Sequence, residues 1–300
     1  MNDHPGTAIS IVVPSLDAST VGRTLDSLRR EGAPGPGVEV IVVGRDHAGL
    51  VPRDTAGLTF LETAEALNPA AARNLGVTHS HGSKILFVDA DCAVQPGWLG
   101  ALSGALDRAP VAGGSVDFPR AGNVWALADN IASFHELLAD RAAEDDTRGP
   151  LGSLNLAVRR ATWDALGGFD PALTTSEDFD WVLRARSRGF ATAFEPAARV
   201  EHAAVRDGRA KLAGHARWYG SNFHDFRQRH PEAFAGGFTW RSRTRLALFS
   251  PLKAVAAALA IFRAHPRALA GTRRAFPGVV LFKWHWYRAV LATWPARGAP

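Results

Sequence analysis

The sequence predicts an α/β protein with a mixed, mainly parallel sheet. Three runs of largely apolar, often β-branched residues, 9–14, 38–43 and 85–88, are typical of strands buried on both faces. A helical pattern separates the first two runs, and this β-α-β order favours a parallel sheet with right-handed crossovers. Asp89 and Asp91 directly follow the third run, at the strand end where open α/β sheets bind ligands.

The first half of the chain alternates between these strands and helical patterns. Apolar residues recur at helical spacing within 20–30, and Gly32 then marks a stop. Asn68 is a predicted N-cap, because Pro69 suits the first helical position. The predicted order is strand 9–14, helix 20–30, strand 38–43, strand 58–61, a helix from residue 68, strand 85–88 and a helix at 97–107.

The second half continues the same pattern. The acidic latter part of a helical segment at 123–148 is expected to be a flap beside the site. Ser176 is the predicted cap of a helix that stops before Gly189. The predicted order is strand 112–116, the helical segment 123–148, strand 152–158, a short helix after 159–160, helix 176–188 and strand 194–200.

Composition and charge divide the chain. The only cysteine is Cys92, so a disulfide framework within the chain is excluded, and the N-terminal residues lack the basic and apolar regions of a signal peptide. We therefore expect a cytoplasmic protein. Residues 233–300 carry 11 Lys and Arg but no Asp or Glu, whereas the preceding residues are net acidic. We expect one domain at 1–232 and a basic, Trp-containing helical tail at 233–300.

The basic tail fits a charged surface as its partner. Residues 246–262 are largely apolar but include Pro251 and Lys253, and a spanning helix needs ~20 consecutive apolar residues. Residues 279–288 set aromatic side chains beside cations, as in helices that lie on an anionic membrane surface. The alternative is that these helices pack on the first domain. Nucleic acid is disfavoured, because no recognised binding module accompanies the charge.

The aspartate pair has two interpretations on its spacing alone. Asp89 and Asp91 can hold Mg²⁺ or Mn²⁺, which in turn binds a diphosphate. Alternatively, the pair caps the helix that begins near Trp98.

Further motifs favour the metal. Residues 9–205 resemble the family 2 glycosyltransferases, inverting nucleotide-sugar enzymes with the GT-A fold. Six pieces occur in the family's order: Val12-Val13-Pro14-Ser15, Ala72-Arg73-Asn74-Leu75-Gly76, the DxD motif Val88-Asp89-Ala90-Asp91, Gly152-Ser153-Leu154-Asn155 with Arg159-Arg160, Gly167-Gly168-Phe169-Asp170 with Ser176-Glu177-Asp178, and Val200-Glu201-His202.

The resemblance implies a GT-A-like nucleotide-sugar-binding domain and assigns roles to particular residues. Asp178 resembles the general base that accepts the proton of the acceptor hydroxyl, with Glu177 orienting a neighbour. Mn²⁺ or Mg²⁺ would be held by Asp91, Asp89 and His202. The residues expected to contact the nucleotide-sugar donor are Pro14, Ser15, Asp17, Asp46, Arg73, Asn74, Asp89 and Asn155.

Two departures from the family pattern refine this expectation. Many members have paired aspartates after the second strand, whereas Gly44-Arg45-Asp46 offers only one, which leaves the donor base open. Polymer-making members carry QxxRW, but the comparable stretch Gly214-His215-Ala216-Arg217-Trp218 lacks the Gln. We therefore expect a single, hexosyltransferase-type transfer. The basic tail separately favours a lipid or lipid-linked acceptor and a peripheral location at the inner face of an anionic membrane.

Two other classes of function are disfavoured by the sequence. A DxDx(T/V) phosphatase is disfavoured, because Ala93 stands where Thr or Val is required and the motif follows a late strand. A nucleotide-sugar-binding module without catalysis is disfavoured by the complete set of Asp89, Asp91, Asp178 and His202.

Overall fold

A computed structural model describes residues 7–141, 149–231 and 242–295 of the chain. The chain forms two compact units, Met1–Asp117 with Glu136–Ala203, and Phe118–His135 with Ala204–Pro300. The acidic part of the expected flap, 142–148, lies outside the described residues. So does the residue after which we expect the first domain to end, 232, and that boundary stays a prediction.

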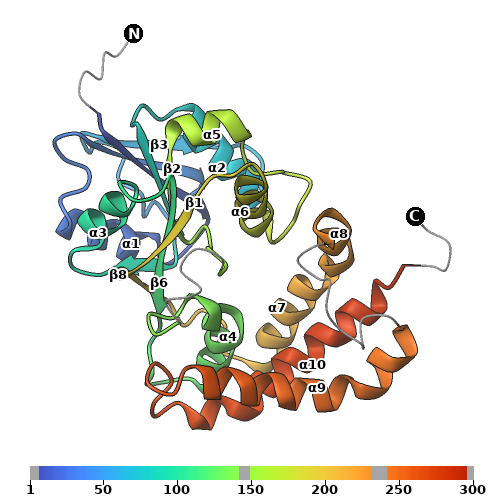
Figure 1. Cartoon of the computed structure of the whole chain (residues 1–300). Coiled ribbons are helices and arrows are strands. Elements are labelled where there is room, and N and C mark those ends of the chain that lie inside the picture. Colours follow the sequence, from blue (N-terminus) through green and yellow to red (C-terminus); the bar gives the residue numbers. More distant parts are fainter. Residues whose placement is uncertain (1–6, 142–148, 232–241, 296–300) are drawn as a thin grey trace. The chain divides into compact units, whose positions relative to one another are not determined.

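The first unit is built on an eight-stranded sheet with the order β3-β2-β1-β4-β7-β6-β8-β5. Four of the seven strand pairings are parallel, so the predicted mixed, mainly parallel sheet is confirmed. The strands are β1 (Ile9–Leu16), β2 (Val38–Arg45), β3 (Leu58–Glu62), β4 (Lys84–Val88), β5 (Cys92–Val94), β6 (Val111–Asp117), β7 (Asn155–Arg159) and β8 (Thr192–His202) (Figure 1).

The helices of the first unit match the predicted order. Asn68 caps α2 as expected, because its side chain accepts a hydrogen bond from the Ala71 N–H at 2.9 Å. Ser176 stands at the N-cap position of α6, but its side chain makes no cap hydrogen bond. The helices are α1 (Val21–Arg30), α2 (Pro69–Thr78), α3 (Trp98–Ala105), α5 (Arg160–Leu166) and α6 (Glu177–Ser187).

Three elements differ from the expectations. The short strand β5 was not predicted, because three residues show no periodicity. The predicted strand from residue 152 begins only at Asn155, and residues 152–154 form a loop instead. Within the segment 123–148, helix α4 (Val124–Phe134) is followed by the 3₁₀ turn η1 (His135–Leu137).

Strand directions bring the ends of several strands to one edge of the sheet. β1 runs parallel to β2 and β4, and β6 runs parallel to β8. β7 is antiparallel to both β4 and β6, so its first residue, Asn155, lies opposite Val88 at the end of β4. The residues that follow β1, β2, β4 and β8 therefore meet at the same edge.

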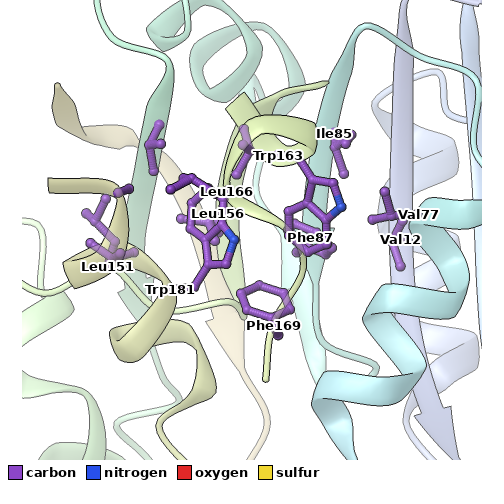
Figure 2. Close-up of a cluster of buried hydrophobic side chains, with 14 of the residues drawn as sticks. Val12, Val77, Ile85, Phe87, Leu151, Leu156, Trp163, Leu166, Phe169 and Trp181 are labelled. Carbon is purple, nitrogen blue, oxygen red and sulfur yellow. The ribbon is translucent and has the colours of Figure 1, made fainter. Parts of the chain in front are cut away.

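A buried aromatic cluster fixes α6 relative to β4 (Figure 2). Trp163 of α5 stacks on Trp181 of α6 with ring centroids 5.5 Å apart, and it contacts Phe87 of β4 at 5.3 Å. Phe169 packs edge-on against Trp163 at 5.0 Å. Because interiors are packed nearly as densely as crystals, this cluster holds the start of α6 at a set position beside the sheet edge.

The second unit is helical. Its elements are α4, α7 (Arg209–Ser221), α8 (Phe223–Arg229), α9 (Arg243–Ala264), η5 (Arg273–Ala275) and α10 (Phe276–Ala292). The aromatics of α10 and of the residues just after it pack inside this unit: Trp284 and Trp286 of α10, and Trp294, lie against a cluster that includes Phe223 and Tyr287. The aromatic stretch expected at a membrane surface is thus partly buried.

Helix α9 corrects the expectation that residues 246–262 are too short to span a membrane. The helix runs for 22 residues through Pro251, with a mean hydropathy of 1.6 in its most apolar window. By length and composition alone it is long and apolar enough to cross a bilayer, although core helices of soluble proteins pass the same test.

Candidate active site

One buried cation joins the end of β4 to the start of α6. The guanidinium of Arg73, on α2, donates to Asp89 Oδ1 at 2.5 Å and to Glu177 Oε1 at 2.8 Å. The Arg73 side chain is only 3% exposed. A buried guanidinium is stabilised when carboxylates pair with it in this way. Two motifs that lie 88 residues apart, Asp89 and Glu177, are thereby brought into one site.

The carboxylates around Arg73 have perturbed pKa values. Burial raises the pKa of Glu177 from 4.5 to about 7, the charge of Asp178 adds to this shift, and Arg73 opposes it. Burial also raises the pKa of Asp89, with Arg73 opposing and Asp91 contributing. For Arg73 itself, burial disfavours the charge, but Asp89 and Glu177 raise its pKa overall. Arg73 is therefore always a cation, and Glu177 titrates near neutral pH.

Asp91 and His202 lie together, next to the pairing of β5 with β8. Cys92 is opposite His202 in this pairing, and His202 Nε2 is 3.3 Å from Asp91 Oδ2. The backbone N–H of Ala203 donates to the Asp91 carbonyl at 2.8 Å, which holds these two segments of the chain together locally. Asp89 turns instead toward Arg73.

The carboxylate of Asp91 and the imidazole of His202 are a pair of ligands that fits a divalent cation. Among the described residues, no group of three or more His, Cys, Asp or Glu side chains is arranged to hold a metal ion. Mg²⁺ and similar ions often retain waters and use one or two carboxylates together with substrate phosphates, so a dedicated cage is not required. One carboxylate and one imidazole suit Mn²⁺ in particular.

The carboxylate of Asp178 is held by the loop that precedes β7. Its Oδ2 accepts hydrogen bonds from the Ser153 backbone N–H at 2.8 Å and from the Ser153 hydroxyl at 3.1 Å, and its Oδ1 accepts from the Phe179 N–H at 2.9 Å. Ser153 stands within one of the motifs of the sequence, but the motif predicts no role for its hydroxyl. A hydroxyl in a loop has no sequence signal that points to a carboxylate 25 residues away.

The loops after β1 and β2 are tied together by Asp17. Its carboxylate accepts from the His47 backbone N–H at 3.0 Å, lies 2.7 Å from His47 Nδ1 and 3.4 Å from the Arg45 guanidinium. The His47 N–H is the main cause of the lowered pKa of Asp17. His47 was not singled out from the sequence, since a lone histidine after a strand is not distinctive.

Three other residues predicted to contact the nucleotide-sugar donor belong to β1 or follow β2, and their surroundings differ. Asp46 accepts from the N–H groups of Leu50 and Val51 at 3.0 and 2.7 Å, so it closes its own loop. Pro14 is half-buried within β1. Ser15 is 3% exposed, and within the described part of the chain its hydroxyl has no hydrogen-bond partner. Such an unsatisfied buried hydroxyl is rare and fits a site that meets a ligand.

Two further residues predicted to contact the nucleotide-sugar donor use their amide groups for hydrogen bonds within the protein. Asn74 accepts from the Phe169 N–H at 2.9 Å and donates to the Phe169 carbonyl at 2.8 Å, so it anchors the turn before α6. Asn155 is 1% exposed; it accepts from the Trp98 indole and donates to the carbonyls of Ser115 and Ala198. The positions of Asn74 and Asn155 give no support to the predicted donor contacts.

Backbone strain marks the same region. Asp17 has φ 52° and Ser176 has φ 63°, and these are the non-glycine residues with positive φ in the described part of the chain. One follows β1 and the other directly precedes Glu177. Strained residues of this kind cluster at ligand sites, because the surrounding structure must hold them there.

Comparisons with known proteins identify the family of this chain and relatives of similar sequence. The sequence model of the family described as "Glycosyltransferase like family 2" matches residues 5–221. The chain is 26% identical over 198 residues to glycosyltransferase AglE from Haloferax volcanii, covering 62% of this chain and 64% of that relative. It is 28% identical over 244 residues to the pre-mycofactocin glycosyltransferase of Mycobacterium tuberculosis, covering 76% of this chain and 49% of that relative. The chain thus spans about half to two thirds of these relatives.

Solved structures share the fold. The mannosyltransferase PcManGT from Pyrobaculum calidifontis, in complex with GDP-Man and Mn²⁺, is similar at a TM-score of 0.52 and 18% identity, over 90% of this chain and 72% of that one. TarS residues 1–349 from S. aureus are similar at a TM-score of 0.52 and 15% identity, over 94% and 90% of the two chains. The expected GT-A-like fold is confirmed by this similarity.

Proposed function

This chain belongs to the glycosyltransferase-like family 2, and we propose that it transfers a single sugar from a nucleotide-diphosphate sugar to an acceptor hydroxyl with inversion. The observation that carries the proposal is the Arg73 bridge, which unites Asp89 at the end of β4 with Glu177 at the start of α6. A donor-side motif and an acceptor-side motif thereby share one site. Family membership favours this reaction over the phosphatase alternative.

Asp91 and His202 are the residues that we assign to a divalent cation, Mn²⁺ or Mg²⁺. Such a cation neutralises the charge that develops on a diphosphate leaving group. The Mn²⁺ in the structure of the Pyrobaculum mannosyltransferase supports this assignment. We assign Asp89, oriented by Arg73, to contact the ribose or a water on the cation. Ser15, with its unpartnered buried hydroxyl, and Asp17 are assigned to contact the nucleotide-sugar donor.

Asp178 is the residue that we assign as general base. It accepts the proton of the acceptor hydroxyl while that oxygen attacks the anomeric carbon, on the side opposite to the departing diphosphate. One displacement of this kind inverts the anomeric configuration. The two hydrogen bonds from Ser153 and the one from Phe179 orient the Asp178 carboxylate before the acceptor arrives.

The stretch that stands where polymer-making family members carry QxxRW favours a single transfer. Gly214 stands at the position of the Gln, and the next residue, His215, is buried and lies 2.9 Å from the carboxylate of Asp129. The excess of Lys and Arg in the C-terminal segment supports a place at the cytoplasmic face of an anionic membrane. An enzyme held there meets lipid or lipid-linked acceptors most readily.

The metal assignment is tested by Asp91→Asn, which keeps the shape of the side chain and removes its charge. In a thermal-shift screen of nucleotide-sugars with Mn²⁺, a ligand at 100 times its Kd stabilises the wild type by ~2.7 kcal/mol. We expect the variant to lose this Mn²⁺-dependent shift while its unliganded melting temperature stays unchanged.

Asp26→Asn is the matched control, because Asp26 is an exposed aspartate on α1 paired with Arg29. It should retain the full shift. An undiminished shift in Asp91→Asn, or in wild type treated with excess chelator, would refute the metal assignment.

A further inference from the structure

Helix α9 has one buried face and one exposed apolar face. Five of the eight exposed large hydrophobic residues in the described part of the chain belong to this helix. Four of them recur at intervals of four, three and four residues, which places them on one stripe. The stripe consists of Leu248 (70% exposed), Leu252 (68%), Val255 (40%) and Leu259 (38%). A continuous exposed apolar surface of this kind marks a contact with a protein or a membrane.

Arginines stand at both ends of the stripe. Arg245 precedes Leu248 by three residues and Arg263 follows Leu259 by four, so both lie on the same side of the helix. At 1.5 Å per residue the two positions are ~27 Å apart. Long cationic side chains at the ends of an apolar stripe can reach the headgroups while the stripe contacts acyl chains.

The opposite face of α9 packs on α10 within the second unit. The buried Leu246 and Ala254 belong to this face. At its two edges, Phe262 contacts Phe276 with ring centroids 5.7 Å apart, and the Lys253 ammonium lies 5.9 Å from the Tyr287 ring. These two contacts show that the helices form an antiparallel hairpin. Because one face of α9 is covered, only the exposed side that carries the stripe can meet lipid, which favours a helix lying in the membrane plane over one that crosses it.

A pocket of about 820 Å³ lies where this hairpin turns, and Leu259 belongs to both the stripe and the pocket. Its apolar lining includes Leu259, Phe262, Leu269 and Phe276, and its cations are Arg263 and Arg273. Both arginines are exposed. Within residues 242–295 there is no Asp or Glu, so no carboxylate of that stretch competes for these guanidiniums.

We propose that this pocket binds the headgroup of an anionic phospholipid in a bilayer, with the phosphate on Arg263 and Arg273 and the acyl chains along Leu259 and the stripe. Guanidinium groups match phosphate in geometry and charge, and the apolar lining matches the glycerol and upper acyl segments. The inference rests on the proposed membrane association, and it adds the docking face, the site and the class of lipid.

The site is tested by flotation of the full-length protein with phosphatidylcholine vesicles, with and without phosphatidylglycerol. Arg267→Gln is the matched control, because Arg267 is an exposed arginine of the same hairpin that does not line the pocket. We expect this control to weaken binding to anionic vesicles about fivefold, the effect of one surface charge. Arg263→Gln and Arg273→Gln should each weaken it by ~10- to 100-fold, because each loses hydrogen bonds to a charged group.

A double variant, Leu248→Gln with Leu252→Gln, tests whether the apolar stripe of α9 contacts the membrane. Both residues are exposed, so the variant should melt as the wild type does, yet bind less to neutral and anionic vesicles alike. The proposal is overturned if Arg263→Gln and Arg273→Gln weaken binding no more than Arg267→Gln. It is equally overturned if the leucine variant binds as the wild type does, or if the wild type does not float with anionic vesicles.

These outcomes are separate from those of the transferase proposal. The Mn²⁺-dependent shift by nucleotide-sugars, measured on the same samples, should be unchanged in every α9 and hairpin variant. Vesicle results that contradict the lipid site while this shift persists leave the transferase proposal intact. Absence of the shift with normal lipid binding contradicts only the transferase proposal.

Discussion

Arg73 and Glu177 illustrate how a single buried pair can serve both structure and chemistry. Arg73 stays charged because carboxylates surround it, whereas burial pushes the Glu177 carboxyl toward its neutral form. The hydrogen bond between them at 2.8 Å holds the first turn of α6, and Asp178 is the next residue. The position of the proposed base is therefore set by a residue that need not touch the substrate.

The raised pKa of Glu177 makes a prediction about stability. An acid whose pKa is higher in the folded state binds extra protons there, so the free energy of unfolding falls as pH rises from 4.5 to about 7. Glu177→Gln removes this titration. Its stability relative to the wild type should therefore be greater at about pH 8 than at about pH 4, as measured by denaturant unfolding at both values.

Glu62→Gln is the control for that comparison, because Glu62 is exposed and pairs with Arg53 at the surface. Its stability relative to the wild type should change little with pH. A pH-independent difference for Glu177→Gln would contradict the raised pKa.

Individual site residues were predictable to different degrees. Asp89, Asp91, Asp178 and His202 stand in spaced motifs beside strand or helix ends, and such patterns can be read from the sequence. The role of Ser153 and the central place of Arg73 depend on side chains that meet only after the sheet has formed. Asn155 shows the converse, since its place in a motif does not reveal that three internal hydrogen bonds occupy its amide.

At the level of elements, α2 packs closely on the sheet that carries the site. A Cβ added at Gly76 would lie 2.4 Å from Val12 Cγ1 and 3.1 Å from Val43 Cγ2. Gly76→Ala must therefore push α2 away from β1 and β2. We expect a loss of ~1–3 kcal/mol in unfolding free energy, as for other overpacked cores, measured by denaturant unfolding.

Gly100→Ala on α3 is the matched control for this change. A Cβ at Gly100 would meet nothing within 4 Å. The substitution should stabilise the protein by about 0.5–1 kcal/mol, because alanine loses less backbone entropy in a helix than glycine does. Equal effects of the two substitutions would contradict the close packing of α2.

Strong periodicity allowed most elements of the first unit to be predicted, whereas the exceptions have local causes. The strands β1, β2 and β4 are apolar runs between clear stops, and α2 has both its cap and its first-turn proline. β5 has three residues and exists because Cys92–Val94 pairs with the end of β8. The loop at 152–154 replaces a predicted strand start, because Ser153 bonds to Asp178 instead of continuing the ladder.

At the scale of the whole molecule, the basic C-terminal helices pack tightly with helices from earlier in the chain. A Cβ on Gly278 of α10 would lie 2.5 Å from Ala128 of α4, and one on Gly220 of α7 would lie 2.6 Å from the Trp286 carbonyl. Composition alone does not reveal these contacts, because they join segments far apart in the sequence. Removal of the residues after 237 would uncover α4 and α7, so point substitutions on α9 test its surface better than truncation.

The central claim, that this site performs an inverting sugar transfer with Asp178 as base, is tested most directly by turnover of Asp178→Asn. Release of nucleoside diphosphate from nucleotide-sugars is measured with Mn²⁺ and a membrane lipid extract as acceptor, alongside the donor-induced thermal shift. Turnover should fall by ~10²- to 10⁴-fold, the usual contribution of a positioned general base, while the donor-induced shift stays as in the wild type. Wild-type turnover in the variant, or loss of the donor-induced shift, would contradict the assignment.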